Sequence, residues 1–140
     1  IEKVVALAVL MPIVASMGGN AGTQTLTVAV RALATKELTS SNAFKIITKE
    51  TLVGGINGII FAIIIGILSS YWFQDNLLGI VIASAMILNL LIAGMAGIII
   101  PLTLNKFKID PALASGVILT TITDVFGFLS FLGLASIFLI

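Results

Sequence analysis

Long apolar runs alternate with short polar connections along this chain. Clusters of charged residues separate four apolar runs, and each run reaches the roughly 20 residues that a helix needs to cross a bilayer. None shows the alternating ten-residue pattern of a membrane β-barrel strand. The pattern predicts an all-α membrane protein with four transmembrane helices, near residues 1–33, 51–73, 77–105 and 111–140.

We expect these helices to form one transmembrane domain over residues 1–140. Lys and Arg predict its orientation, because cytoplasmic connections are enriched in both. A long connection over 34–50 and a short one over 105–110 carry cations, whereas the 74–76 turn and the C-terminus carry none. We therefore expect both cationic connections in the cytoplasm, and the 74–76 turn and both chain ends outside. We also expect a multi-pass protein of the cell's inner (plasma) membrane. An N-terminus that faces outward is explained if at least one transmembrane helix precedes this chain.

Composition supports the membrane assignment and excludes several kinds of chemistry. Hydrophobic residues make up 59% of the chain and charged residues 9%, where a soluble domain carries about a quarter charged. A net charge of +1 gives no basic patch for nucleic acid. Cys and His are absent, which removes thiol chemistry and the commonest general base. A Ser or Thr nucleophile would lack an evident base, so we do not expect an enzyme.

The first apolar run contains a polar stretch, GGNAGTQTLT, at Gly18–Thr27. Threonine hydroxyls can bond back to their own helix, but the amides of Asn20 and Gln24 cannot do so as easily. One interpretation is a clamp of hydrogen bonds between helices. The other is a polar lining, with Gly18 and Gly19 allowing close approach of the backbone. Polar or irregular backbone at membrane depth needs protein or water around it in either case.

Asp124, in TTITDVFG, is the only ionisable residue inside a predicted span. A carboxylate at that depth costs roughly 2.5–3.5 kcal/mol on insertion scales. It is therefore expected to be protonated, to face water, or to pair with a cation from outside the chain. At helical rise, Asp124 lies about 21 Å from Asp110 and Asn20 about 16 Å from Arg31. These depths predict that Asn20 and Asp124 occupy neighbouring layers.

Other small and polar residues inside the spans allow a structural interpretation. Asn89 either joins the polar layer or packs between helices. Glycine pairs and triplets in two runs favour close helix packing of the small-xxx-small kind, at Gly54, Gly55, Gly58, Gly94 and Gly97.

Two motifs resemble a known transporter family. Pro12 followed by Gly18–Gln24 resembles the second transmembrane helix of the MgtE magnesium transporter/channel family. Asp110–Ala112, Ser115–Gly116 and Thr120–Gly127 resemble its fifth. The motifs keep the family's order, and the resemblance covers nearly the whole chain. It implies that these four helices are a fragment of a five-helix domain, without the first helix.

The resemblance also implies a function and a site. It implies a homodimer in the lipid bilayer that carries Mg²⁺, as transported ion, through one pore on its two-fold axis. Asp124 matches the carboxylate of the central ion site, the backbone near Thr120 would help to hold the hydrated ion, and Asn20 matches a pore-side asparagine. Further candidates for the pore lining are Gly19, Gln24 and Thr121. Gating would depend on cytosolic regulatory domains of the full-length protein, which this chain does not contain.

Two other functions remain open at this point. A proton-translocating membrane subunit could use Asp124 as its proton site, although it would not need the layer of Asn20 and Gln24. A non-transporting assembly module could use the same polar residues only for packing.

Overall fold

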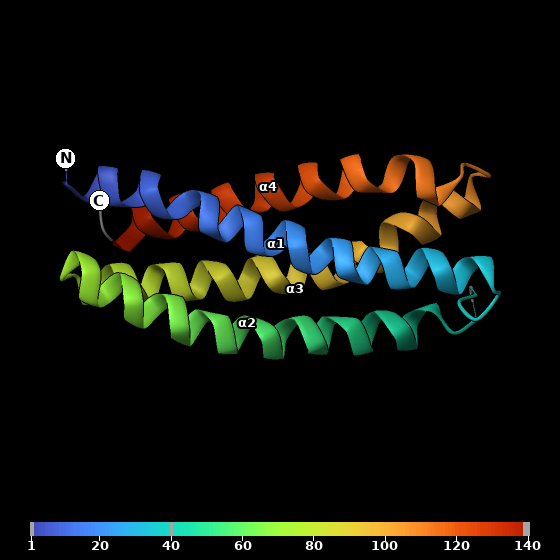
Figure 1. The fold of residues 1–140 in the computed structure, drawn as a ribbon, viewed down its shortest axis with the longest axis horizontal. Coiled ribbons are helices and arrows are strands. Elements are labelled where there is room, and N and C mark those ends of the chain that lie inside the picture. Colours follow the sequence, from blue (N-terminus) through green and yellow to red (C-terminus); the bar gives the residue numbers. More distant parts are fainter. Residues whose placement is uncertain (1, 40, 139–140) are drawn as a thin grey trace.

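The computed structural model describes residues 2–39 and 41–138 and, within them, contains helices and short connections without strands. The helices are α1 (Glu2–Ala34), α2 (Ala43–Phe73), α3 (Asn76–Lys106) and α4 (Pro111–Phe138). They run along one long axis as an up-and-down bundle (Figure 1). All four are long and apolar enough to cross a membrane, so the predicted all-α membrane fold is confirmed. The outermost predicted helical positions, 1 and 139–140, lie outside the described residues.

The third helix is the centre of the bundle. α3 packs against α1, α2 and α4, whereas α1 scarcely touches α2. The α2–α3 turn lies at the same end of the bundle as the two chain ends (Figure 1). The connections after α1 and after α3 both lie at the opposite end (Figure 1).

Small residues bring the backbones of α2 and α3 into contact. Four of them lie at intervals of one helical turn on the buried face of α2: Gly54, Gly58, Ala62 and Gly66. A Cβ added at Gly54 would lie 2.6 Å from the carbonyl oxygen of Leu90, and one added at Gly94 would lie 2.7 Å from that of Glu50. The predicted close packing of these glycines is confirmed.

Carboxylate side chains cap the N-termini of two of the helices. Asp75 precedes α3, and its Oδ1 accepts hydrogen bonds from the backbone N–H groups of Leu77 (3.1 Å) and Leu78 (3.2 Å). Asp110 precedes α4 in the same way and accepts from the N–H of Ala112 at 3.0 Å. With Pro111 as the first helical residue, α4 begins where sequence preferences place a helix start.

The connection after α1 is shorter than the 34–50 segment expected from the sequence, because α2 already begins at Ala43. Asn42 closes this connection: its Nδ2 donates to the carbonyl of Glu37 (2.7 Å), and its Oδ1 accepts from the N–H of Thr39 (2.8 Å). Residues 43–50 contain no glycine or proline to stop a helix. At 31 residues, α2 is about 46 Å long and exceeds the roughly 30 Å hydrocarbon core, so its charged first turns extend beyond the core.

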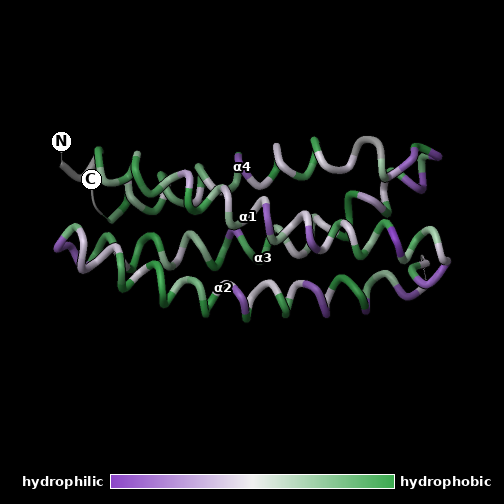
Figure 2. Tube along the Cα trace, in the orientation of Figure 1, coloured by the Kyte–Doolittle hydropathy of each residue, from purple (hydrophilic) through white to green (hydrophobic). Residues whose placement is uncertain are grey.

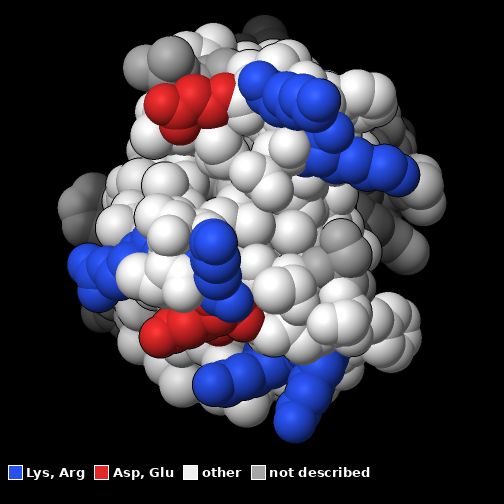
Figure 3. All heavy atoms as spheres, turned by 90° about the vertical axis from the view of Figure 1, so that its right-hand side faces the viewer, with Lys and Arg blue, Asp and Glu red and all other residues white. Residues whose placement is uncertain are grey.

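Cationic side chains gather at the end of the bundle that holds these two connections. Viewed from that end, Lys and Arg side chains spread over the surface between a few acidic ones (Figure 3). All six cations of this end are exposed: Arg31, Lys36, Lys45, Lys49, Lys106 and Lys108. The α2–α3 turn at the other end carries no Lys or Arg.

A matched pair of glycine substitutions tests the α2–α3 contact. Gly54→Ala should destabilise the protein by roughly 1–3 kcal/mol, because its Cβ meets the backbone of α3. Gly133→Ala in α4, where an added Cβ meets nothing within 4 Å, should be neutral or stabilising, since Ala favours helices over Gly. Thermal unfolding in detergent measures both. Equal melting temperatures for the two variants would contradict this packing.

Candidate functional site

A polar groove runs between α1 and α4, about midway along the bundle. It has a volume of about 410 Å³. Its lining residues recur at intervals of three or four positions on each helix, so they form one face of α1 and one of α4. They are Pro12, Ala15, Ser16, Gly19, Asn20 and Thr23 of α1, with Thr120, Asp124 and Phe128 of α4.

The groove brings together four of the six candidate residues. Gly19, Asn20, Thr120 and Asp124 all line it. The Asn20 side chain is exposed and that of Asp124 is partly buried. In the hydropathy view, hydrophilic stretches interrupt the green of α1 and α4 well away from the ends of the bundle (Figure 2). Asn20 and Asp124, which were expected at neighbouring depths, therefore line the same groove.

The other two candidates lie outside the groove lining. Gln24 is exposed on α1, one turn beyond Asn20, and Thr121 is exposed on α4. Conversely, Ser16 and Phe128 line the groove without having been predicted from the sequence. Each lies four residues from a candidate, Ser16 from Asn20 and Phe128 from Asp124, and this helical spacing is the signal that could have identified them.

Threonine hydroxyls in and beside the groove donate to their own helices. Thr23 Oγ1 donates to the carbonyl of Gly19 (2.7 Å), Thr120 Oγ1 to Gly116 (2.8 Å) and Thr121 Oγ1 to Val117 (2.8 Å). This behaviour was expected from the sequence. With their protons committed, the hydroxyl oxygens can act only as acceptors, so Thr23 and Thr120 present acceptors to the groove.

Asn89 of α3 packs between helices rather than joining the groove lining. It is fully buried, and its Nδ2 donates to the carbonyl of Val14 in α1 at 2.9 Å. This is the interhelical clamp considered for the polar layer, but a residue of α3 provides it. Asn20 stays exposed at the groove.

The groove presents one carboxylate and several neutral acceptors. Within residues 2–39 and 41–138, no three acidic, His or Cys side chains gather to form a metal-binding cluster. Hard divalent ions such as Mg²⁺ and Ca²⁺ take six to eight oxygen ligands when fully dehydrated, and this lining offers only one carboxylate among its oxygens. Carboxylate, amide and hydroxyl oxygens suit a hydrated cation, whose water molecules donate hydrogen bonds to them.

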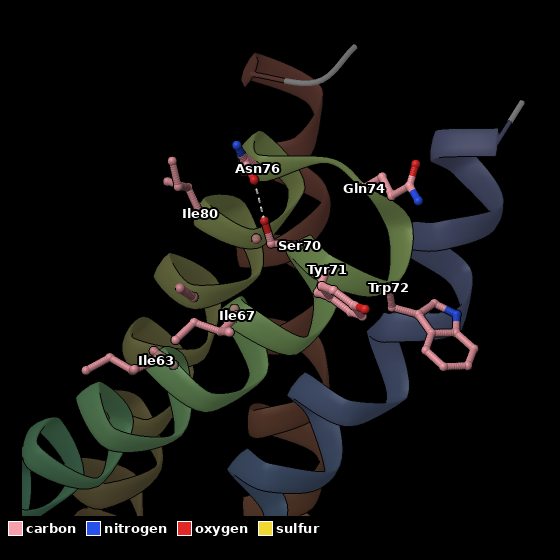
Figure 4. Close-up of a pocket in the computed structure, with 12 residues that line it drawn as sticks. Ile63, Ile67, Ser70, Tyr71, Trp72, Gln74, Asn76 and Ile80 are labelled. Atoms are coloured by element: carbon pink, nitrogen blue, oxygen red, sulfur yellow. Dashed lines mark hydrogen bonds between the residues drawn. The ribbon is translucent and has the colours of Figure 1, made fainter.

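A second, larger hollow lies beside the turn between α2 and α3 and differs in chemistry. It has a volume of about 1150 Å³, and its lining between Ala62 and Ala83 contains no acidic side chain. Ile63, Ile67 and Ile80 lie along it, and Ser70 Oγ bonds to Asn76 Oδ1 at 2.7 Å (Figure 4). Tyr71 and Trp72, both exposed, are among its lining residues (Figure 4). This hollow fits lipid chains and an interfacial aromatic belt better than an ion.

Comparison with known proteins agrees on one family. The profile of the MgtE family, described as a divalent cation transporter, matches residues 11–134. The magnesium transporter MgtE of Bacillus subtilis is 40% identical over 139 residues, which are 99% of this chain and 31% of that protein. The magnesium transporter MgtE of Enterococcus faecalis is 39% identical over 133 residues, 95% of this chain and 29% of that protein.

A third relative is more distant in sequence. The magnesium transporter MgtE of Thermus thermophilus is 33% identical over 139 residues, 99% of this chain and 31% of that protein. The chain thus spans about a third of the length of the relatives that it matches.

Introduced cysteines test whether the groove holds water. The chain has no native Cys, so Asn20→Cys or Thr120→Cys supplies its only thiol. In lipid, a charged methanethiosulfonate reagent should modify either thiol at least about tenfold faster than one facing hydrocarbon, because the reaction needs a hydrated thiolate. Ile59→Cys, on the exposed apolar face of α2, is the matched control. Equally slow modification at all three positions would show that lipid fills the groove.

Proposed function

The chain belongs to the MgtE family of divalent cation transporters, and from this membership we propose that it carries Mg²⁺ across the membrane along the groove between α1 and α4. The observation that carries the proposal is the meeting of Asn20 and Asp124 in one groove at membrane depth. Asp124 is the thirteenth residue after Pro111, or about 20 Å along α4. A carboxylate so far from a helix end is a functional site by default.

The lining chemistry suits a hydrated ion. Mg²⁺ is small and loses its water molecules reluctantly, so proteins usually bind it with several of them retained. Asp124 would balance part of the charge and accept hydrogen bonds from the ion's water molecules. Asn20 Oδ1, Thr23 Oγ1 and Thr120 Oγ1 would accept others. Few direct ligands also favour conduction, because an ion must be able to leave its site.

A homodimer would complete the site. One carboxylate leaves half of the charge of Mg²⁺ unbalanced, and a two-fold axis beside the groove would bring a second Asp124 to face the first. The exposed polar residues on α1 support this arrangement: Ser16, Asn20, Thr23, Gln24 and Thr27. In a helix long and apolar enough to span the membrane, such residues are expected to face a water-filled space or another protein surface.

The distribution of cations supports an orientation. All cations outside the first turn of α1 lie towards the end with the connections after α1 and α3 (Figure 3). We place this end in the cytoplasm of a cell bounded by the plasma membrane, by the positive-inside rule. Cytosolic regulatory domains of the full-length protein would then adjoin it, and the α2–α3 turn would face outside.

A proton-translocating subunit, the alternative considered from the sequence, finds no support in the comparisons, which name magnesium or divalent cation transport. The groove also places a neutral amide and hydroxyl acceptors beside the carboxylate. A proton site has no need of them.

Removal of the carboxylate tests the proposed site. Asp124→Ala should reduce Mg²⁺ uptake by proteoliposomes of the full-length protein to the level of protein-free vesicles, while the dimer, measured by cross-linking, persists. The physical reason is the loss of the only charge that faces the ion on each chain.

Asp110→Ala is the matched control for this substitution. It removes a carboxylate that caps α4, and it should cost about 1 kcal/mol of stability while leaving saturable uptake in place. Normal uptake by Asp124→Ala would rule out Asp124 as the ion site. Proton flux through the protein that does not respond to Mg²⁺ would favour the alternative function.

Sidedness of labelling tests the orientation. In intact cells, an impermeant thiol reagent should modify Gln74→Cys in the α2–α3 turn and should modify Lys36→Cys only after the membrane is opened. The reason is that cations of connecting segments remain on the cytoplasmic side. The reverse pattern would invert the proposed topology.

A further inference from the structure

We infer that Asn89, which lies outside the groove, is a positioning residue that fixes the spacing of α1 and α4. This inference rests on the proposed ion site, because its consequence is the width of the groove that holds Asn20 and Asp124. It assigns to α3 a role in ion recognition without contact with the ion.

Asn89 links helices that are distant in sequence. Its Nδ2 bonds to the carbonyl of Val14, 75 positions away. Each of the other side-chain hydrogen bonds found within the described residues joins positions at most six apart, the longest being Ser70 to Asn76 across the α2–α3 turn. The Asn89 bond therefore ties α1 to α3 in the middle of the bundle.

Two glycines, one on each of the helices that form the groove, leave the space that the Asn89 amide fills. A Cβ added at Gly18 of α1 would lie 2.8 Å from Asn89 Cγ. A Cβ added at Gly127 of α4 would lie 3.1 Å from Asn89 Nδ2 and 3.5 Å from the Cα of Ala15. The amide is thus wedged where α1 and α4 approach each other, and its size and position limit how closely they can pack.

Along the helix axes, the Asn89 amide lies close to Asn20 and Asp124. Gly18 precedes Asn20 by two residues and Gly127 follows Asp124 by three, separations of about 3 Å and 4.5 Å at helical rise. A shift of either backbone at the wedge therefore moves Asn20 or Asp124 almost directly. In metal sites, groups that orient the ligands matter nearly as much as the ligands themselves.

The chemistry of Asn89 indicates geometry rather than stability as its contribution. Its Oδ1 is buried without a hydrogen-bond partner in the described part of the chain. A buried acceptor without a partner opposes folding, and an apolar side chain of similar size would avoid that cost. The donated bond, in contrast, fixes the register of α1 against α3.

The test compares two substitutions on α3 in the full-length protein. Asn89→Leu keeps the branching of the side chain at Cγ, is somewhat larger, and removes the donor. Leu91→Ala, the matched control, disturbs a side chain two residues away whose Cδ2 lies 3.0 Å from the position of a Cβ added at Gly55 of α2. Spin labels on Val9→Cys of α1 and Leu129→Cys of α4, both exposed and outside the groove, report the spacing of the two helices.

We expect Asn89→Leu to shift or broaden the label distances and to weaken the apparent Mg²⁺ affinity of uptake by roughly 10- to 100-fold. Leu91→Ala should leave both unchanged. Unchanged distances in Asn89→Leu, or an equal loss of affinity in Leu91→Ala, would overturn the positioning role. Absence of Mg²⁺ uptake by the wild-type protein would instead reject the proposed function, and the label distances would still test Asn89.

A second variant keeps the inference testable if Asn89→Leu fails to fold. Gly18→Ala alone should be strongly destabilising, because its Cβ meets the Asn89 amide. Adding Asn89→Ala makes room for that Cβ and should restore folding, but not the label distances or the Mg²⁺ affinity. Full recovery of both by the double variant would show that the space matters and the amide does not.

Discussion

The need to satisfy polar groups inside a bilayer organises this structure. Hydrocarbon offers no hydrogen bonds, so each polar side chain in a spanning helix needs a partner from protein or water. Threonines find theirs in carbonyls one turn away, as Thr23 and Thr120 do. Asn89 finds one on another helix. Asn20 and Asp124 instead line an open groove between two helices, where water and ions can be their partners.

Small residues decide where that groove can form. Glycines on α2 and α3 bring these helices together along most of their length. Gly97 lets α1 approach α3 as well, since a Cβ there would lie 3.0 Å from the carbonyl oxygen of Gly22. α1 and α4 each pack against α3 and also against each other. The polar groove lies between α1 and α4, where Asn20 is exposed.

Much of the fold and part of the site could be predicted from the sequence. Apolar runs predicted the four helices, and helical rise predicted the shared depth of Asn20 and Asp124. Depth along an axis does not give rotation about it, so the sequence could not show that Asn20 and Thr120 line the groove while Gln24 and Thr121 lie outside it. Rotation depends on which neighbour a helix packs against, and the role of Asn89 depends on contact with Val14, far away in sequence. The early start of α2 was missed because its charged first turns extend beyond the hydrocarbon core.

The near absence of contact between α1 and α2 has a consequence for biogenesis. A membrane protein is synthesised from its N-terminus, so α1 is inserted before α3 and α4 have been made. Asn20 then lacks the groove wall that α4 provides, and α2, which follows α1 in the chain, scarcely touches α1. α2 and α3, joined by a short turn, can pair as soon as both are inserted, and they form a platform on which α1 and then α4 settle. The groove at Asn20 is therefore complete only after the last of the four helices has been inserted.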